Sequence, residues 1–302
     1  MLLLAVGCAS PRLDPARTAA LPQRVALEST PFHPQEVNHC GPAALASVLG
    51  AAGIAATPDG LAPAVYLPAR EGSLPLDMLG GSRRAGAMAL RIAPDLEGLM
   101  EQVAAGMPVV VLQNLSLQWV PMWHYAVVIG FDRPRGTITL RSGREPRQVL
   151  SLRTFEHTWA RSGHWAMIAF RPGQLPVGVP REPYTESAVA LERLGRLAEA
   201  RAAYEAGLTP WPGDPTLAVG LANVAHAQGD RGGAETALRQ ALQYHPRSDA
   251  LLNNLAHLVA EDGRLEEALG LAESAVTLAG PHQATARETR DEIRRRLDTG
   301  AR

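Results

Sequence analysis

The sequence predicts an α+β domain followed by an all-α domain of helical repeats. In the first half, small-residue helical stretches precede short apolar runs rich in β-branched residues, an order typical of α+β domains. A proline-rich segment then interrupts the chain near residue 176, and beyond it the sequence repeats with a period of 34 residues. The length of 302 residues also exceeds what one hydrophobic core usually supports.

The composition excludes some classes of function. Hydrophobic residues make up 46% of the chain and charged residues 20%, which is typical of a globular protein. The formal net charge of −1 gives no reason to expect nucleic acid or an anionic membrane surface as a partner. No segment after the N-terminus approaches the ~18 apolar residues of a transmembrane helix.

The first eight residues are an apolar run that ends in Gly7 and Cys8. This pattern resembles the lipobox of bacterial lipoproteins, in which the cysteine is diacylated and becomes the mature N-terminus. The resemblance implies a membrane anchor at Cys8 and, because Ala9 and Ser10 do not look like an inner-membrane retention signal, an outer-membrane lipoprotein facing the periplasm. Residues 1–8 are then a signal remnant, and residues 9–29, rich in Pro, Ala and Arg, a tether.

Two alternatives stay open for this cysteine. It can be a stray residue in an apolar tail, or it can form a disulfide with Cys40, the only other cysteine.

The elements expected in the first domain, residues 30–172, follow from periodicity and from Gly and Pro positions. A short strand at 24–29 leads into a proline-fixed approach to the first helix. The expected helices cover 41–52, a short stretch from 57, 74–85, 95–105 and 154–161, and the expected strands cover 109–112, 125–131, 137–140 and 165–170.

The second half begins after a proline-rich linker at 173–180. Small residues recur every 34 positions through residues 181–282, which lets paired helices approach closely, with a glycine at each turn. This resembles three tetratricopeptide repeats and implies binding of a protein partner; residues 283–302 would be a capping helix and tail. The recurring residues are Ala188, Ala222 and Ala256, then Gly195, Gly229 and Gly263, then Ala200, Ala234 and Ala268, then Gly207, Ala241 and Ala275.

Three residues of the first domain form a candidate thiol site. Cys40 stands at the start of the first helix, and His124 opens an apolar strand. A helix N-terminus and a nearby imidazolium both lower the pKa of a thiol, so we expect a thiolate–imidazolium pair. Gln35 and the backbone N–H of Cys40 are candidate donors to an oxyanion.

These residues resemble a known family. Gln35, the run from Cys40 to Leu45 and the run from His124 to Gly130 are similar to the double-glycine leader peptidases, the protease domains of bacteriocin exporters. The stand-alone lipoprotein branch with C-terminal tetratricopeptide repeats is more similar still. The resemblance implies a papain-like fold, with Cys40 as nucleophile, His124 as base and Gln35 in the oxyanion hole.

Papain-like sites also orient the histidine with Asp or Asn. Ser142 is the positional counterpart here, so we assign it a weak orienting role. Asp132 is eight residues from His124 on the same strand, too far to reach the imidazole at ~3.3 Å per residue.

Further residues around the site have less specific roles. Trp119 and Trp123 flank the histidine and are candidates to line a peptide groove, with core or rim packing as the alternative. No cofactor is expected. His33, His39, Cys40 and His124 could ligate zinc, but their spacing fits no common zinc pattern, and no metal is expected.

The sequence therefore predicts a membrane-anchored cysteine peptidase that acts on a peptide or protein substrate. A catalytically weak scaffold, or an acyltransferase or cell-wall amidase on the same fold, stay open as alternatives.

Overall fold

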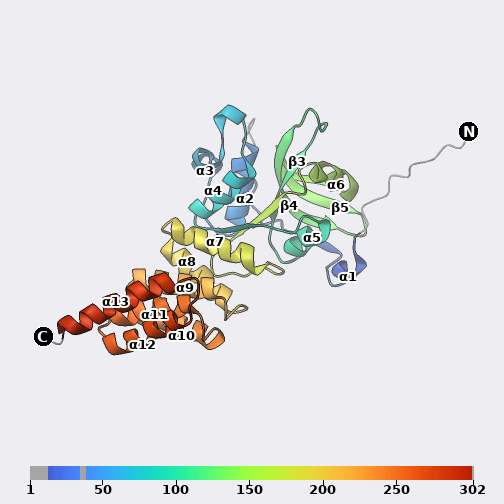
Figure 1. Ribbon diagram of the computed structural model, residues 1–302. Coiled ribbons are helices and arrows are strands. Elements are labelled where there is room, and N and C mark those ends of the chain that lie inside the picture. Colours follow the sequence, from blue (N-terminus) through green and yellow to red (C-terminus); the bar gives the residue numbers. More distant parts are fainter. Residues whose placement is uncertain (1–12, 35–38, 301–302) are drawn as a thin grey trace, which may run out of the picture. The chain divides into compact units, whose positions relative to one another are not determined.

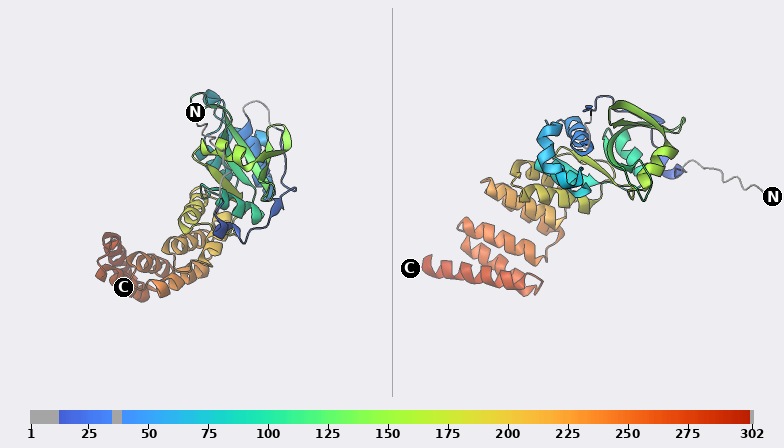
Figure 2. Two further views of the ribbon diagram at one scale, coloured as in Figure 1. Left: turned by 90° about the vertical axis from the view of Figure 1, so that its right-hand side faces the viewer. Right: turned by 90° about the horizontal axis from the view of Figure 1, so that it is seen from above.

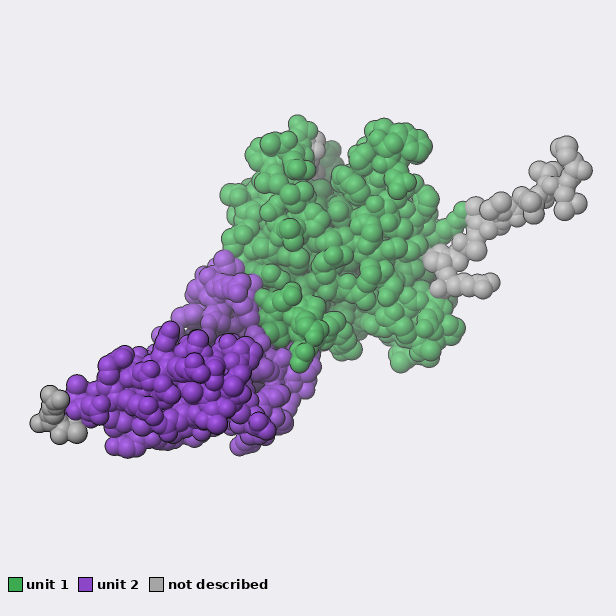
Figure 3. All heavy atoms as spheres, in the orientation of Figure 1, with its two compact units in different colours: residues 1–187 green, residues 188–302 purple. Residues whose placement is uncertain are grey.

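The computed structural model describes residues 13–34 and 39–300 (Figure 1). The chain divides between Ser187 and Ala188 into two compact units, which Figure 3 colours separately. The first unit is a mixed α/β domain, and the second consists of helices alone, which confirms the predicted fold class. Among the described residues, none of the helices combines the length and the apolar character needed to span a bilayer.

The first unit is built on a seven-stranded antiparallel sheet. Its strands follow the order β2-β7-β3-β4-β5-β6, and β1 pairs with the second half of β4. The predicted strands correspond to β1, β3, β4, β5 and β7. The bounds are β1 Arg24–Ala26, β2 Met88–Arg91, β3 Val109–Asn114, β4 Trp123–Asp132, β5 Thr137–Ser142, β6 Glu145–Ser151 and β7 Ala166–Phe170.

The helices of the first unit include every helix that the sequence predicts there. The central one, α2, buries the run from Gly41 to Leu49 against β3, β4 and β7, where Val110, Ile129 and Met167 form part of the core. This burial explains the small residues of α2, because they let the helix approach the sheet closely. The bounds are α1 Pro15–Thr18, α2 Cys40–Ala51, α3 Pro58–Val65, α4 Pro75–Arg84, α5 Leu96–Ala104 and α6 Leu152–Ala160, with a 3-10 turn at Pro68–Arg70.

The segment expected to be a tether packs on the first unit from residue 14 onward. The backbone N–H of Asp14 donates to Glu97, and Arg17 pairs with Asp95 and Glu101 at 3.0 Å each. The segment's polar composition gave no sign of this docking, because its partners are acidic residues about 80 positions away. Cys8 lies outside the described residues.

Gly130 lets β1 approach β4 closely. A Cβ atom at this position would lie 2.4 Å from the carbonyl oxygen of Val25, so only glycine fits. The β4–β5 register shifts beside it, between Val128 and Gly130. Gly130, near the end of β4, is therefore required for the pairing of β1 with β4, independently of any role at the candidate site.

The second unit is a stack of antiparallel helix pairs (Figure 2). The recurring alanines are buried at the helix contacts, and the turn residues Gly195, Gly229 and Gly263 have φ of 71°, 81° and 80°, which favours glycine. The bounds are α7 Arg181–Arg193, whose first turns belong to the first unit, then α8 Leu197–Leu208, α9 Pro215–Ala227, α10 Arg231–Tyr244, α11 Asp249–Glu261, α12 Leu265–Thr277 and α13 Gln283–Gly300.

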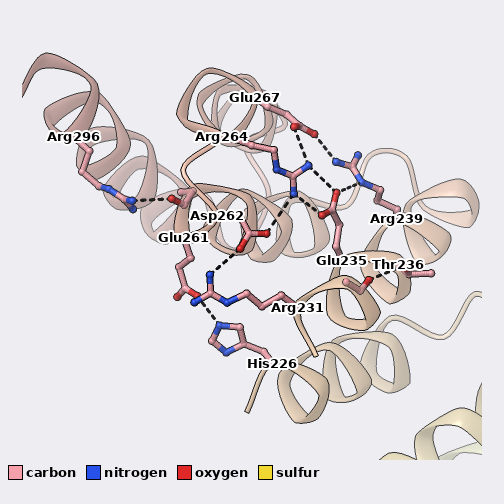
Figure 4. A network of polar contacts seen from close by, with 12 residues as sticks. His226, Arg231, Glu235, Thr236, Arg239, Glu261, Asp262, Arg264, Glu267 and Arg296 are labelled. Carbon is pink, nitrogen blue, oxygen red and sulfur yellow. Dashed lines mark hydrogen bonds and ion pairs between the residues drawn. The ribbon is translucent and has the colours of Figure 1, made fainter. Parts of the chain in front are cut away.

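Ion pairs link successive repeats on the surface of this unit (Figure 4). Arg264 contacts Glu235 from the preceding repeat at 3.2 Å, and Glu235 also pairs with Arg239 at 2.7 Å. Arg231 reaches Asp262 at 2.8 Å. These contacts join the helix pairs at their turns, outside the buried alanine core.

Candidate active site

Cys40 is the first residue of α2 and carries a free thiol. The N-cap residue, His39, makes no side-chain capping bond; its ring instead packs edge-on against Tyr66, with centroids 4.9 Å apart. The sulfur therefore lies at a helix N-terminus whose N–H groups are available to it, as the sequence predicts.

The electrostatics of this thiol differ from the sequence expectation. Burial raises the pKa of Cys40, while hydrogen bonds from the backbone N–H groups of Tyr125, Gly41 and Cys40 itself act in the opposite direction. From the sequence we expected the helix N-terminus and a nearby imidazolium to lower the pKa of this thiol. The sequence could not anticipate how strongly the neighbouring loops remove this thiol from water.

His124 is the second residue of β4 and lies opposite Gln113 of β3. Its Nε2 atom is 3.0 Å from Oγ of Ser142, at the end of β5. Burial lowers the pKa of His124. With Nε2 engaged by the serine, Nδ1 is the ring nitrogen left to exchange a proton with another group.

One pocket of about 870 Å³ is lined by both candidate residues. Cys40 and His124 both line it, and the N–H of Tyr125 that reaches the sulfur belongs to the residue after His124. Its other lining residues come from the 3-10 turn and the loop that leads into α4, from β3, β4 and the segment between them, and from the β5–β6 turn: Arg70, Glu71, Gly72, Ser73, Leu74, Pro75, Leu112, Leu115, Met122, Trp123, Tyr125, Gly143 and Arg144.

The loop before α4 packs directly on the first turn of α2. Tyr125 donates its hydroxyl proton to the carbonyl oxygen of Ser73 at 3.2 Å, and burial holds the pKa of Tyr125 well above its ordinary range, so it stays a donor. A Cβ atom on Gly41 would lie 2.2 Å from Oγ of Ser73. Gly41 is thus the residue that lets this loop form a wall of the pocket beside Cys40.

The hairpin of residues 115–123, between β3 and β4, exposes large apolar side chains at one end of the pocket. Its shape is fixed by Asn114, whose Oδ1 accepts from the N–H groups of Ser116 and Met122, and by Arg161, which binds the carbonyl of Asn114. These bonds fix the backbone at the base of the hairpin. Its exposed apolar residues are Leu115, Leu117, Trp119, Val120, Met122 and Trp123.

The two tryptophans predicted to line a groove differ in their positions. Trp123 lines the pocket and is 50% exposed, whereas Trp119 is 77% exposed near the tip of the hairpin and does not line it. Both tryptophans belong to the same exposed hairpin, and only Trp123 reaches the pocket.

The remaining sequence-predicted residues take no part in the described site. Gln35 lies outside the described residues, so its oxyanion role stays a prediction. Asp132 pairs with Arg24 at 2.9 Å, as expected of an acid too far from His124. Within the described ranges, no cluster of three or more His, Cys, Asp or Glu is arranged to hold a metal ion.

Sequence reasoning missed three contributors to the site: Tyr125, Ser73 and Asn114. Tyr125 follows His124 directly and could have been considered for that reason. Ser73 and Asn114 carry no motif, and their contacts exist only after the loop before α4 and the hairpin have folded.

Comparison with known proteins agrees with the two-part organisation. Residues 23–167 match the model of the Peptidase_C39 like family, and residues 184–215 and 219–283 match that of the tetratricopeptide repeat. The chain thus carries a C39-like peptidase domain followed by tetratricopeptide repeats, which confirms the resemblance stated from the motifs.

Solved structures similar to parts of the chain include a protein described as a C39-like peptidase from Bacillus anthracis, with 20% identity and a TM-score of 0.43 over 50% of this chain and 98% of that one. The first TPR of Spaghetti, bound to an HSP90 peptide, has 20% identity and a TM-score of 0.36, covering 38% and 90%. MamA from Desulfovibrio magneticus RS-1 has 19% identity and a TM-score of 0.35, covering 39% and 67%. No curated protein matches the chain significantly.

Proposed function

We propose that this protein is a cysteine peptidase in which Cys40 is the nucleophile and His124 the acid–base group. The observation that carries the proposal is the 3.0 Å contact between Nε2 of His124 and Ser142, in a pocket that Cys40 also lines. A ring held at one nitrogen by a hydroxyl is oriented to exchange a proton at the other. That is the arrangement a thiol needs for nucleophilic attack.

The proposed reaction starts from a neutral Cys40 thiol and a neutral His124 imidazole, because burial favours both of these forms. His124 takes the thiol proton as the sulfur of Cys40 bonds to a peptide carbonyl carbon. It then gives this proton to the leaving amine, and a thioester remains on Cys40. Water, activated by His124, hydrolyses the thioester and restores the thiol. N–H groups at the start of α2 and the side chain of Gln35 are the proposed oxyanion donors.

We further propose that the substrate is a peptide or protein segment with bulky apolar side chains near the cleaved bond. Leu112, Leu115, Met122 and Trp123 line one side of the pocket, and the apolar hairpin extends beyond it. Large apolar side chains that stay exposed beside a pocket are typical of a binding site.

The repeats are proposed to bind a protein partner or to recruit the substrate. A pocket of about 320 Å³ in the second unit has mixed chemistry suited to a polypeptide, with Asn223, His226, Asn254 and His257 beside Ala222 and Leu258. Amide and imidazole groups can pair with backbone N–H and C=O groups of an extended chain.

The location in the outer membrane, through a lipid on Cys8, is also a proposal. Its test is metabolic labelling with a radioactive fatty acid in a bacterial host. The label should appear on the native protein and be absent from a Cys8→Ala variant. A native protein that carries no label excludes the lipid anchor.

The test of the proposed activity is cleavage of a peptide library rich in apolar residues, read by mass spectrometry. The native protein should cleave, and Cys40→Ala and His124→Ala should reduce the rate at least about 10³-fold, because covalent catalysis and proton transfer are both lost. Cleavage that survives Cys40→Ala would exclude the mechanism. Amine acceptors in the same assay would reveal acyl transfer as a product with the acceptor attached.

A catalytically weak scaffold is the second candidate, and one observation favours it. Burial raises the pKa of Cys40, and a hydroxyl rather than a carboxylate contacts His124. Both features disfavour a preformed thiolate. A native protein that cleaves no peptide in the library, yet retains a partner through its repeats, would support this candidate.

A further inference from the structure

Arg141 precedes Ser142 in β5, and its guanidinium group binds backbone carbonyls from two other segments. Nη2 donates to the carbonyl oxygens of Glu28 and Thr30, each at 2.9 Å. Nη1 donates to the carbonyl of Pro146 in β6. One side chain thus joins the chain at 28–30 to the two strands beside the site.

Residues 27–34 precede α2 in the chain. Contacts with β4, with α2 and with Arg141 of β5 fix their backbone. The N–H of Leu27 donates to Ile129 of β4 at 2.7 Å, and Thr30 is only 3% exposed. Pro31 packs against α2 at Gly50, where a Cβ atom added to the glycine would lie 2.9 Å from Cγ of the proline.

Arginine suits this position for a physical reason. Its planar group carries several N–H donors in a fixed fork, so it can serve separate carbonyls at once, whereas a lysine ammonium is a compact point charge. The carbonyl of Thr30 belongs to a buried residue, and a buried carbonyl without a donor costs free energy. The segment therefore depends on Arg141 to hold its observed course.

We propose that Arg141 is a positioning residue for the candidate active site. It acts by holding residues 28–30 against β5, which keeps Pro31 packed on Gly50 of α2 and so keeps the helix that begins at Cys40 in place relative to His124. Adjacent residues of β5 then serve the two reactive groups: Ser142 contacts the ring of His124, and Arg141 fixes the approach to the nucleophile. The inference rests on the proposed function, because it takes Cys40 and His124 to be the reacting pair.

The test compares Arg141→Met and Arg141→Lys with a matched control, Arg147→Met, in the full chain. Arg147 also contacts Glu28, but through its exposed carboxylate at 3.3 Å rather than through the backbone. Three quantities are measured for each variant: amide hydrogen exchange over residues 27–34, the pH dependence of iodoacetamide alkylation of Cys40, and kcat and KM for a cleaved peptide.

Arg141→Met should speed exchange at least about tenfold over residues 27–34, while α2 to α5 keep native protection. Alkylation should move to lower pH, toward the behaviour of an ordinary thiol, because Cys40 becomes less buried. The value of kcat should fall about tenfold or more, with KM within about twofold, because misplacement of reacting groups affects the chemical step. For all three quantities, Arg141→Lys should give values between those of the native protein and Arg141→Met, and Arg147→Met should give native values.

The proposal is overturned if Arg141→Met keeps native exchange and alkylation, or if Arg147→Met changes them equally. It is also overturned if faster exchange spreads through the whole first unit, since that pattern indicates a purely structural role. If Arg141→Met does not fold, Arg141→Lys decides by the same criteria. Responses in exchange and alkylation, in a protein that cleaves no peptide even in its native form, uphold the positioning role and reject the proposed function.

Discussion

At the scale of single residues, burial decides the protonation state of the candidate reactive pair. Burial raises the pKa of Cys40 and lowers that of His124, so both changes favour the neutral forms. The sequence indicates the elements that carry both residues, because one stands at a helix start and the other opens an apolar strand, and in the structure both line one pocket. It cannot predict how far loops distant in sequence exclude water.

The shift at Cys40 predicts a pH dependence of stability. The folded-state pKa lies above the unfolded value, so the neutral thiol stabilises the fold fully below about pH 8.5, and this contribution is lost as the pH rises through the folded-state value. Urea unfolding at pH 7 and pH 10 should therefore show a larger loss for the native protein than for Cys40→Ser. Equal losses would mean that Cys40 is not buried as described.

The contact between Ser142 and His124 predicts a change in activity rather than in folding. Ser142→Ala should lower kcat/KM about tenfold, because the ring loses its orienting partner, while stability falls by about 1 kcal/mol. Ser142→Asp should raise the pKa of His124 and shift the acid limb of the kcat/KM profile to higher pH. Native kcat/KM in Ser142→Ala would show that the serine has no role in orienting His124.

At the scale of elements, the strands that escaped prediction share a cause. β6 carries Pro146 and several polar residues and lies at the edge of the sheet, so apolar alternation is weak, and β2 has only four residues. The docking of residues 14–18 and the shape of the hairpin at 115–123 depend on contacts with distant residues. Elements whose signal lies in local periodicity were predicted, and those made by tertiary contacts were not.

The hairpin at 115–123 predicts two separable effects. Asn114→Ala should cost about 1–3 kcal/mol of stability, because it removes the buried acceptor that the part-buried N–H groups of Ser116 and Met122 share. Trp123→Ser should change stability by less than about 0.5 kcal/mol, as is usual for exposed positions, and yet raise KM for apolar peptides several-fold. Trp119→Ser tests the tip in the same way. Native KM values for both tryptophan variants would show that the hairpin does not bind the substrate.

The ion pairs between repeats reverse their charges from one interface to the next. Arg201 contacts Asp230 at 2.6 Å, and 34 positions on, Glu235 contacts Arg264 at 3.2 Å. A slip by one repeat would oppose like charges, so the reversal favours the native neighbours.

Charge reversal in the second pair should show this coupling. Glu235→Arg should lower stability by about 1 kcal/mol, since it opposes both Arg239 and Arg264, and the added change Arg264→Asp should recover part of the loss. Urea unfolding of the double-mutant cycle measures the coupling. If the double variant is no more stable than the less stable of the two single variants, the two residues are not coupled.

At the scale of the whole molecule, the chain combines a C39-like peptidase domain with tetratricopeptide repeats. The repeats were predictable because small residues at a fixed period reflect helix packing that recurs in each copy. In the candidate site, the sequence pointed only to Cys40, His124, Trp123 and Ser142 among the described residues that contact one another or share the pocket. The site's supporting contacts from Tyr125, Asn114 and Arg141 come from single residues without a motif, and only the folded chain reveals them.

The central claim is that Cys40 and His124 act as one chemical unit. It is tested most directly by the pH dependence of Cys40 alkylation by iodoacetamide, in the native protein and in His124→Gln. The account predicts that loss of the imidazole slows alkylation at neutral pH at least about tenfold and moves its midpoint to higher pH, because no base remains to accept the thiol proton. Superimposable profiles for the two proteins would contradict the account.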